Sequence, residues 1–322
     1  MALACWRSIV ACSLLLGPML VSCRPSSPRP REHETPASAS PSPIELEAGA
    51  PTASATLPAP AIPVDAAEPV PERWVELYYP GWTMARRPAG SIDLSSVSDV
   101  VLFGLVPVGR RADATPTGLD DRRVASATAA ARAGGASVLV CVGGERTGER
   151  FRDAIGEDGA ELAASIAAFV GRHGLDGVVL DVEPLSAVAE PALVAFVTTL
   201  RERLRASNAH ARVEAVVAPD AREIARLAPI ASLLDRVAVM SYLARTSDED
   251  DARLVERIVA LGIARDRVGL GIDARTPEER ARRRADAVRD GRAGGIILWH
   301  AGSLCGRGDA GARCAPTASL LR

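Results

Sequence analysis

This chain of 322 residues contains no lysine, so arginine supplies all 38 of its permanently basic side chains. The 40 acidic residues nearly balance them, and the net charge of −2 gives no electrostatic reason to expect nucleic acid or an anionic membrane surface as a partner. Aromatic residues are scarce, at 3%, and no pattern of His and Cys indicates a metal site, so we expect no metal and no cofactor. The composition is still 48% hydrophobic, which is enough to bury a substantial core.

The first 22 residues have the form of a targeting segment. Arg7 precedes an apolar run at residues 9–21 that is too short to span a bilayer as a helix. The run ends in the letters LVSC, which resemble the lipobox of bacterial lipoproteins; an ordinary signal peptide with a chance cysteine is the alternative. The resemblance implies that residues 1–22 are a signal peptide and that Cys23 carries a lipid.

Residues 23–71 are rich in Pro, Ser and Ala and contain little that a core could bury, which predicts a disordered tether. We therefore expect an exported lipoprotein that meets the membrane only through its lipid anchor. Arg24 stands where a retention signal would place Asp, which favours the outer membrane or the cell surface. The folded domain is expected to span residues 72–322 and to be a monomer.

The remaining cysteines differ in their surroundings. Cys141 lies in an apolar run and is expected to be a buried thiol. Cys305 and Cys314 flank a Gly-rich loop of a domain that we expect to be exported, which favours a disulfide between them.

From residue 72 onward, short apolar runs alternate with amphipathic stretches. The runs are rich in Val, Ile and Leu, as are parallel strands covered on both faces. Eight such units in this length predict an α/β fold with a single (β/α)8 TIM barrel. An open doubly wound sheet is the alternative, but the first strand is not followed by a glycine-rich phosphate fingerprint. The predicted strands are 74–82, 98–108, 137–144, 176–184, 212–219, 236–242, 267–273 and 294–301, with helical patterns at 120–135, 159–174, 191–208 and 248–263 and a first connection, 83–97, too short for a full helix.

The segment DGVVLDVEP, residues 176–184, contains the candidate catalytic residues. Alternate side chains of a strand share a face, so Asp181 and Glu183 point the same way, with Val179 below them. Pro184 then ends the strand because it cannot donate to a sheet ladder. Two acids at the carboxyl end of a parallel strand lie where barrel enzymes place their active sites.

These strands resemble glycoside hydrolase family 18, the family of chitinases and endo-β-N-acetylglucosaminidases. The family's fourth-strand motif, D-G-x-D-x-D-x-E, is matched by DGVVLDVE here. The resemblance implies that Glu183 is the general acid, that Asp181 accepts the substrate acetamido N–H and that Tyr242 donates to its carbonyl. Further matches suggest substrate-binding positions at the ends of other strands, namely Trp299, Tyr79, Met240, Gly143 and Gly144.

Three departures from the family pattern bear on activity. Val179 stands in place of the innermost acid of the motif, Leu243 in place of an Asp after Tyr242, and Cys141 in place of a Ser. A valine cannot share a proton with Asp181, so we expect the titration of Asp181 to differ from the family norm. Glu183, which lies beside a second carboxyl and is expected to be partly buried, should have a raised pKa.

The resemblance implies hydrolysis of glycans that contain β-linked N-acetylglucosamine, by a substrate-assisted retaining mechanism. Outside the targeting segment, all Trp and Tyr residues lie on the first, sixth and eighth predicted strands, which suits a short open groove rather than a long aromatic cleft. Two alternatives stay open: a lectin-like barrel that binds carbohydrate without cleaving it, and an unrelated barrel hydrolase. The loss of acids at Val179 and Leu243 favours the lectin-like barrel, whereas the presence of Glu183 speaks against it.

Overall fold

The structure is a computed structural model that describes residues 73–243, 248–305 and 314–315. The predicted signal peptide, the tether and the lipidation site at Cys23 lie outside the described residues. Among the residues that are described, no helix combines the length and the apolar character needed to cross a bilayer.

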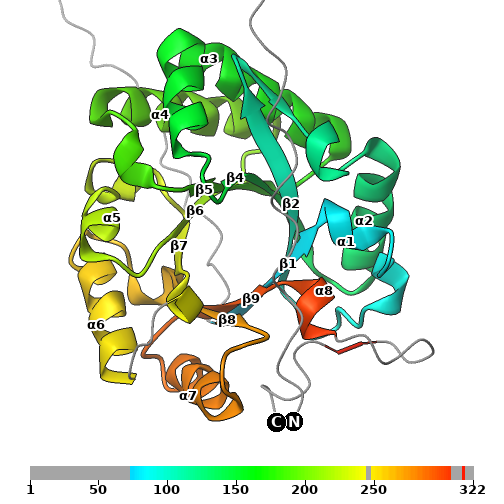
Figure 1. The fold of residues 1–322 in the computed structure, drawn as a ribbon, viewed down its shortest axis with the longest axis vertical. Coiled ribbons are helices and arrows are strands. Elements are labelled where there is room, and N and C mark those ends of the chain that lie inside the picture. Colours follow the sequence, from blue (N-terminus) through cyan, green and yellow to red (C-terminus); the bar gives the residue numbers. More distant parts are fainter. Residues whose placement is uncertain (1–72, 244–247, 306–313, 316–322) are drawn as a thin grey trace, which may run out of the picture. The chain divides into compact units, whose positions relative to one another are not determined.

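Eight parallel strands close into a ring, which confirms the predicted barrel (Figure 1). Closure depends on β1, which pairs with β2 on one side and with β9 on the other. Every predicted strand is present, with ends that differ by up to three residues from the prediction. The barrel strands are β1 (Trp74–Pro80), β2 (Asp99–Val108), β4 (Ser137–Gly144), β5 (Gly177–Val182), β6 (Arg212–Val217), β7 (Arg236–Val239), β8 (Val268–Asp273) and β9 (Gly295–Trp299).

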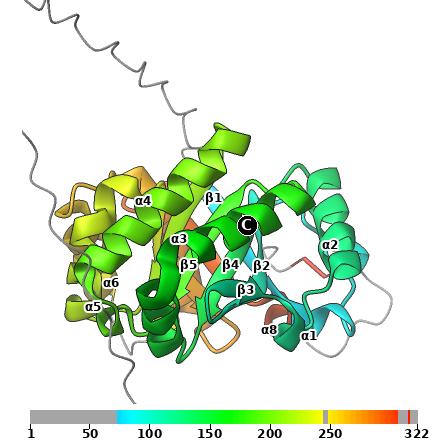
Figure 2. The same ribbon diagram turned by 90° about the horizontal axis from the view of Figure 1, so that it is seen from above.

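Helices surround the ring, and the short elements that follow β1, β2 and β9 gather at one end of it (Figure 2). As expected, the connection after β1 contains no full helix and holds only α1 and a 3-10 turn at Ala89–Ser91. The helices are α1 (Gly81–Met84), α2 (Asp121–Ala133), α3 (Gly148–His173), α4 (Glu190–Ser207), α5 (Ala221–Ala225), α6 (Asp248–Val259), α7 (Glu278–Arg289) and α8 (Ala301–Leu304).

Two elements differ from the prediction. The strand β3 (Arg111–Asp113) was missed; it pairs antiparallel with the end of β2 through a tight turn in which Gly109 has a φ of 52°. The helix expected from residue 159 begins at Gly148 and bends at Asp158, where φ is −164° and ψ is 87°. The Asp158 carboxylate accepts a hydrogen bond from the Glu161 N–H at 2.9 Å, as an N-cap does, so the prediction found only the second half of a bent helix.

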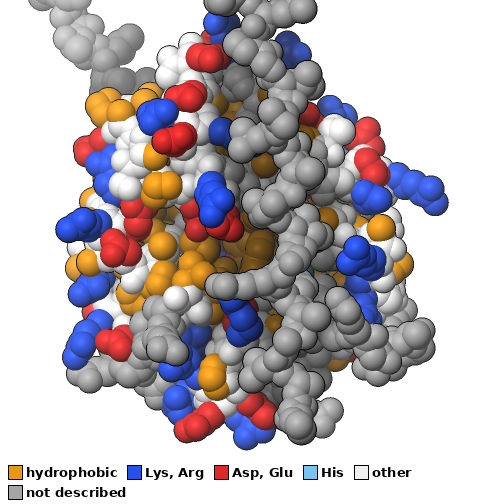
Figure 3. Space-filling model, viewed as in Figure 1, with side chains coloured by type: hydrophobic (Ala, Val, Ile, Leu, Met, Phe, Trp, Pro, Cys, Tyr) orange, Lys and Arg blue, Asp and Glu red, His pale blue; other side chains and the backbone are white. Residues whose placement is uncertain are grey.

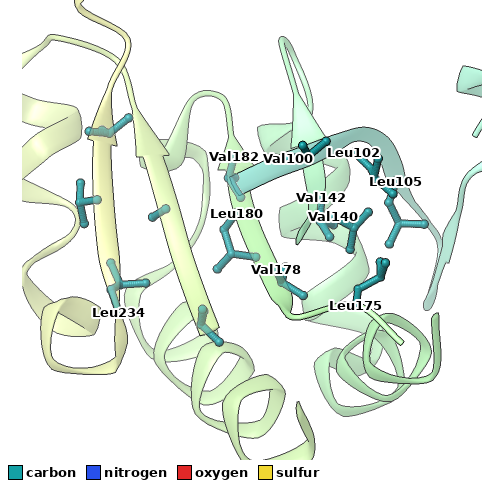
Figure 4. Close-up of a cluster of buried hydrophobic side chains, with 14 of the residues drawn as sticks. Val100, Leu102, Leu105, Val140, Val142, Leu175, Val178, Leu180, Val182 and Leu234 are labelled. Atoms are coloured by element: carbon teal, nitrogen blue, oxygen red, sulfur yellow. The ribbon is translucent and has the colours of Figure 1, made fainter. Parts of the chain in front are cut away.

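Side chains of the strands alternate between two apolar cores. One face of each strand packs under the helices, as Val178, Leu180 and Val182 of β5 do in Figure 4. The other face fills the barrel interior, where alternate strand positions from around the ring meet. The buried interior cluster consists of Trp74, Tyr78, Val101, Phe103, Leu139, Cys141, Val179, Val216, Ala238, Met240 and Ile297.

The amino-terminal end of the barrel interior is ionic. The Asp99 carboxylate accepts hydrogen bonds from Arg212 and Arg236, the latter at 2.7 Å. The Arg236 guanidinium also lies 4.6 Å from the centroid of the Trp74 ring, a cation–π contact. Two further carboxyls, Glu76 and Glu214, complete this end of the interior, and both are buried.

Candidate active site

The strand β5 delivers two carboxyls to the carboxyl end of the barrel. Asp181 points into the interior and is 4% exposed, and Glu183 follows two residues later with its side chain partly open to solvent. Burial raises the pKa of Asp181 well above its ordinary value, and the charge and hydrogen bond of Glu183 raise it further.

The pKa of Glu183 is raised as well, first by burial, although the hydrogen bond from Asp181 opposes this shift. Two nearby carboxylates, Glu145 and Glu223, add to the rise. Since both shifts have the same direction, the pair retains a proton to higher pH than isolated carboxyls would.

Behind Asp181 the interior contains a thiol, a phenol and a valine in place of a further carboxyl. Val179 is 1% exposed and belongs to the interior cluster, as the alternation of β5 predicted. The buried Cys141 Sγ lies 4.0 Å from Asp181 Oδ2. The Tyr78 hydroxyl is buried and has no hydrogen-bond partner among the described residues, nor does Asp181 Oδ1.

Tyr242 follows β7 and lies near the acid pair. Burial raises the pKa of its hydroxyl, and Asp181 and Glu183 raise it further, so the phenol is within electrostatic reach of both acids. Its ring packs closely over Gly271 of β8, where a Cβ would come within 2.7 Å of a ring carbon. The phenol is thus seated at the carboxyl end of the barrel beside the two carboxyls.

Trp299 ends β9 and packs against the interior cluster. Its ring centroid lies 5.5 Å from that of Tyr78 and 4.9 Å from that of Phe103, in edge-on arrangements. Trp299, Tyr242 and the two carboxyls therefore lie at the same end of the barrel. They belong to β9, to the turn after β7 and to the end of β5. Figure 3 shows this face with apolar side chains at the centre of the ring and charged ones beside them.

Two further aromatic residues lie at the barrel mouth, and neither was among the predicted site residues. Trp82 is 48% exposed, and its ring meets Phe103 edge-on at 5.4 Å and His300 at 6.3 Å. The signal for Phe103 was its even spacing from Asp99 and Val101, which all share the inner face of β2. The predicted first strand, 74–82, included Trp82, whereas in the structure Trp82 lies beyond the end of β1, in α1.

The prediction that Tyr79 binds substrate was wrong. Tyr79 is 3% exposed, packs in the core under the helices and donates its hydroxyl hydrogen to the Arg87 carbonyl at 2.5 Å. Adjacent strand residues point to opposite faces, so only one of the two neighbouring tyrosines can face the interior, and it is Tyr78.

The remaining predicted positions lie at this end of the barrel, but three of them serve packing. Met240 is 4% exposed in the interior cluster. A side chain on Gly143 would collide with the Asp181 carbonyl, and one on Gly144 would come within 2.9 Å of the Phe103 ring. Both glycines have positive φ and allow β4 to lie close to the acid-bearing strand.

A cavity of about 270 Å³ opens beside Glu183. Within its wall, the Glu223 carboxylate accepts hydrogen bonds from the N–H groups of Leu185, at 2.7 Å, and Ser186, at 3.3 Å. This contact fixes the turn that follows Glu183. The cavity is lined by Glu145, Arg146, Val182, Glu183, Pro184, Val217, Ala218 and Glu223.

Away from the acids, Cys305 and Cys314 form a disulfide in the structure, with Cα atoms 5.5 Å apart. Within the described part of the chain, His, Cys, Asp and Glu side chains form no group that could hold a metal ion.

Solved structures with the same fold are chitinases and related enzymes, at low sequence identity. Catalytic domain 2 of the Group II chitinase from Ostrinia furnacalis superposes with a TM-score of 0.63 at 14% identity, covering 77% of this chain and 95% of that one. A family 18 N-acetylglucosaminidase from Paenibacillus barengoltzii gives 0.60 at 15% identity over 71% and 95% of the two chains. The family GH18 chitinase from Cycas revoluta, in complex with allosamidin, gives 0.61 at 14% identity over 70% and 94%.

No curated protein sequence matches the chain. At the level of family, however, the sequence model of "Glycosyl hydrolases family 18" matches residues 76–260, which is more than half of the chain and includes β5, β7 and the acid pair. The chain belongs to glycosyl hydrolases family 18.

Proposed function

We propose that this protein hydrolyses glycans that contain β-linked N-acetylglucosamine, with Glu183 as the proton donor. The observation that carries the proposal is the pair of neighbouring carboxyls, Asp181 and Glu183, at the end of the barrel that also holds Tyr242 and Trp299. Both carboxyls have a raised pKa, and glycoside cleavage needs an acid that keeps its proton.

The chemistry follows from the raised pKa values of both carboxyls, which favour retention of a proton by the Asp181–Glu183 pair in the free protein. When the substrate's acetamido N–H donates to Asp181, the ionised form of Asp181 is favoured and Glu183 carries the proton. Glu183 then transfers it to the glycosidic oxygen while the bond from that oxygen to the anomeric carbon breaks.

The acetamido carbonyl oxygen of the same sugar forms the new bond to the anomeric carbon, giving a cyclic oxazolinium. Tyr242 donates a hydrogen bond to this group and Trp299 provides an apolar floor for the ring. Water next attacks the anomeric carbon, and Glu183, now a carboxylate, takes the proton that the water loses. This returns the pair to its starting protonation state.

The first test is a panel of chitin oligosaccharides, N-glycan cores and peptidoglycan fragments incubated with the full chain. We expect product from at least one of them and a loss of at least about a hundredfold in kcat for Glu183→Gln. Glu202→Gln, which removes an exposed carboxyl on α4, is the matched control and should retain activity. A lack of product from the whole panel would contradict the proposal.

A carbohydrate-binding barrel without catalysis is the second candidate, and the valine at position 179 is the observation that favours it. It predicts that Glu183→Gln binds N-acetylglucosamine oligomers as tightly as the natural chain and that neither protein cleaves them. Fluorescence of Trp299 and Trp82 during titration with oligomers measures the binding, and product analysis decides between the two candidates.

We also propose that the barrel is displayed on the cell envelope by a lipid on Cys23, as the lipobox-like sequence suggests. In a bacterial host, the natural chain should partition with membranes and incorporate labelled fatty acid. Cys23→Ser should do neither, and equal membrane partitioning of both proteins would contradict the anchor.

A further inference from the structure

A buried arginine outside the barrel supports the segment that carries Tyr242. Arg284 of α7 is 1% exposed, and its guanidinium forms a two-point ion pair with Asp251 of α6. Nε lies 2.7 Å from Asp251 Oδ2, and Nη2 lies 3.1 Å from Oδ1. Such planar, bidentate pairing fixes the orientation of the guanidinium.

The same guanidinium donates to two backbone carbonyls, one in the turn just after β7 and one within β8. Arg284 Nη1 donates to the Gly271 carbonyl at 2.6 Å, and Nη2 to the Ser241 carbonyl at 3.2 Å. Ser241 Oγ in turn donates to the Gly271 carbonyl at 3.1 Å and accepts from the Gly271 N–H at 3.0 Å. Arg284, Ser241 and Gly271 thus form one buried hydrogen-bonded unit.

This unit contains two groups that adjoin Tyr242. The Ser241 carbonyl belongs to the peptide bond that leads into Tyr242, and the Tyr242 ring packs directly over Gly271. A shift of either group moves the phenol relative to the acids. Leu243, the residue that follows Tyr242, is 54% exposed.

We infer that Arg284, oriented by Asp251, is a positioning residue that holds the Tyr242 hydroxyl against the Asp181–Glu183 pair. The inference rests on the proposed function of this site. Its physical basis is that a hydrogen bond to a developing transition state is sensitive to displacements of well under 1 Å, whereas the barrel fold itself tolerates them.

The test is a double-mutant cycle between Arg284→Met and Tyr242→Phe. Arg284→Met should lower kcat about tenfold or more with little change in KM, because the ground-state contacts of the sugar with Trp299 remain. In the Tyr242→Phe background the same substitution should cost less than about threefold, since the hydroxyl that it displaces is already gone. Losses that multiply independently would overturn the inference.

Asp251→Asn is the milder variant if Arg284→Met folds poorly, because it keeps the guanidinium and weakens only its orientation. We expect a smaller loss of kcat that is also absent in the Tyr242→Phe background. A loss that persists undiminished in that background would overturn the inference.

The matched control is Asp235→Asn at the opposite end of the barrel. Asp235 is a buried carboxyl, 8% exposed, that accepts a hydrogen bond from Arg205 at 3.1 Å and from the Val213 N–H at 2.8 Å. Its loss should lower stability without changing kcat. If kcat simply follows stability in both variants, Arg284 has only a structural role and the inference fails.

A cavity of about 100 Å³ lined in part by Asp251, Leu270 and Arg284 allows a rescue experiment. In Arg284→Ala, added methylguanidinium can occupy the vacated site beside Asp251, and we expect it to restore part of kcat. It should not restore Tyr242→Phe, and an equal response of both variants would count against a positioning role.

A second readout does not need activity. The chain has only three tyrosines, so ultraviolet absorbance of phenolate follows their summed ionisation during a pH titration, and the difference from Tyr242→Phe gives the contribution of Tyr242. Tyr242 is shielded by burial and by Asp181 and Glu183; in Arg284→Met it should ionise at lower pH, and this change should vanish in the double variant with Tyr242→Phe. Identical titrations of Arg284→Met and the natural chain would refute the inference, whereas lack of turnover with a shifted titration would refute only the proposed activity.

Discussion

At the scale of single residues, the site is defined by what lies under Asp181. Cys141, Val179 and Tyr78 form a floor that carries no carboxyl, and Glu183 is the carboxyl that raises the pKa of Asp181. Burial raises the pKa of both carboxyls, which favours retention of a proton at the mouth of the barrel. A site of this composition concentrates its proton chemistry in one carboxyl pair at the mouth of the barrel.

Val179→Asp tests this arrangement directly. A carboxyl at this buried position would lie on the same face of β5 as Asp181. Like-charge repulsion would then raise the pKa of the Asp181–Glu183 pair further. Activity that needs the protonated pair is lost as pH rises through its pKa, so the alkaline limb of kcat/KM should move to higher pH, by about one unit or more. Stability should also fall, by about 1–3 kcal/mol, because an acid replaces a packed valine. An unchanged pH profile in the folded variant would contradict this account.

The alternation of strand residues is enough to predict which acids converge, because it depends only on a period of two. It placed Asp181, Glu183 and Val179 on one face of β5 without structural information. It could not choose between Tyr78 and Tyr79, since a shift of one residue in the strand's start reverses every assignment. The roles of Arg284 and Asp251 were not predictable at all, because they depend on how side chains of α6 and α7 pack against each other and against the backbone of β8 and of the turn after β7.

At the scale of elements, the strands β1, β2, β6 and β7 are joined at their amino ends by buried charges. Two guanidinium groups, Arg212 and Arg236, face the three carboxyls of Glu76, Asp99 and Glu214. Burial alone would raise the pKa of Asp99, but the two arginines hold it below its ordinary value. Burial and then Glu214 and Asp99 raise the pKa of Glu76 well above its ordinary value, so Glu76 retains a proton to higher pH than an exposed glutamate does.

This assignment predicts opposite effects of two similar substitutions. The folded state binds a proton at Glu76 that the unfolded state releases, so the free energy of unfolding falls as pH rises from the ordinary Glu pKa toward the raised one. Glu76→Gln mimics the protonated form; it should stay within about 1 kcal/mol of the natural chain in mild acid and lose less stability at alkaline pH. Denaturant unfolding across pH measures both effects, and a parallel pH dependence of the two proteins would contradict the assignment.

Asp99→Asn is the contrasting change in the same network. It leaves Arg212 and Arg236 without their shared carboxylate and should cost about 3–5 kcal/mol at neutral pH. The natural chain should lose the corresponding stability as pH falls through the lowered pKa of Asp99, and the variant should not. A cost below about 1 kcal/mol at neutral pH would show that solvent reaches these charges.

Elements of the barrel were more predictable than their ends. Runs of Val, Ile and Leu signal buried parallel strands wherever they occur, and all eight were found. The three residues of β3 carry no such signal, since their pairing depends on the turn at Gly109 and on β2 extending beyond the ring. The first half of α3 was missed because its residues, GERFRDAI, mix charged and apolar side chains just after two glycines.

At the scale of the whole molecule, closure of the barrel brings the two ends of the described chain together. β1 pairs with β9, and the chain beyond β9 reaches the segment that follows β1. The Cys314 N–H donates to the Ser91 carbonyl at 3.0 Å, and the Cys314 carbonyl accepts from the Asp93 N–H at 2.6 Å. The disulfide to Cys305 therefore ties this contact to the helix that follows Trp299.

The disulfide closes a loop with a sequence separation of 9, and a loop of this size restricts the unfolded chain by about 3 kcal/mol in the chain-entropy treatment. Changing both Cys305 and Cys314 to Ser should lower the free energy of unfolding by about 2–3 kcal/mol, measured by denaturant at neutral pH. Activity below the unfolding transition should be retained, because Trp299 is held by its ring contacts with Tyr78 and Phe103 and not by the crosslink. A large loss of kcat in the folded double variant would instead show that the segment beyond β9 positions Trp299, and the site would then depend on closure of the barrel as well as on the acids of β5.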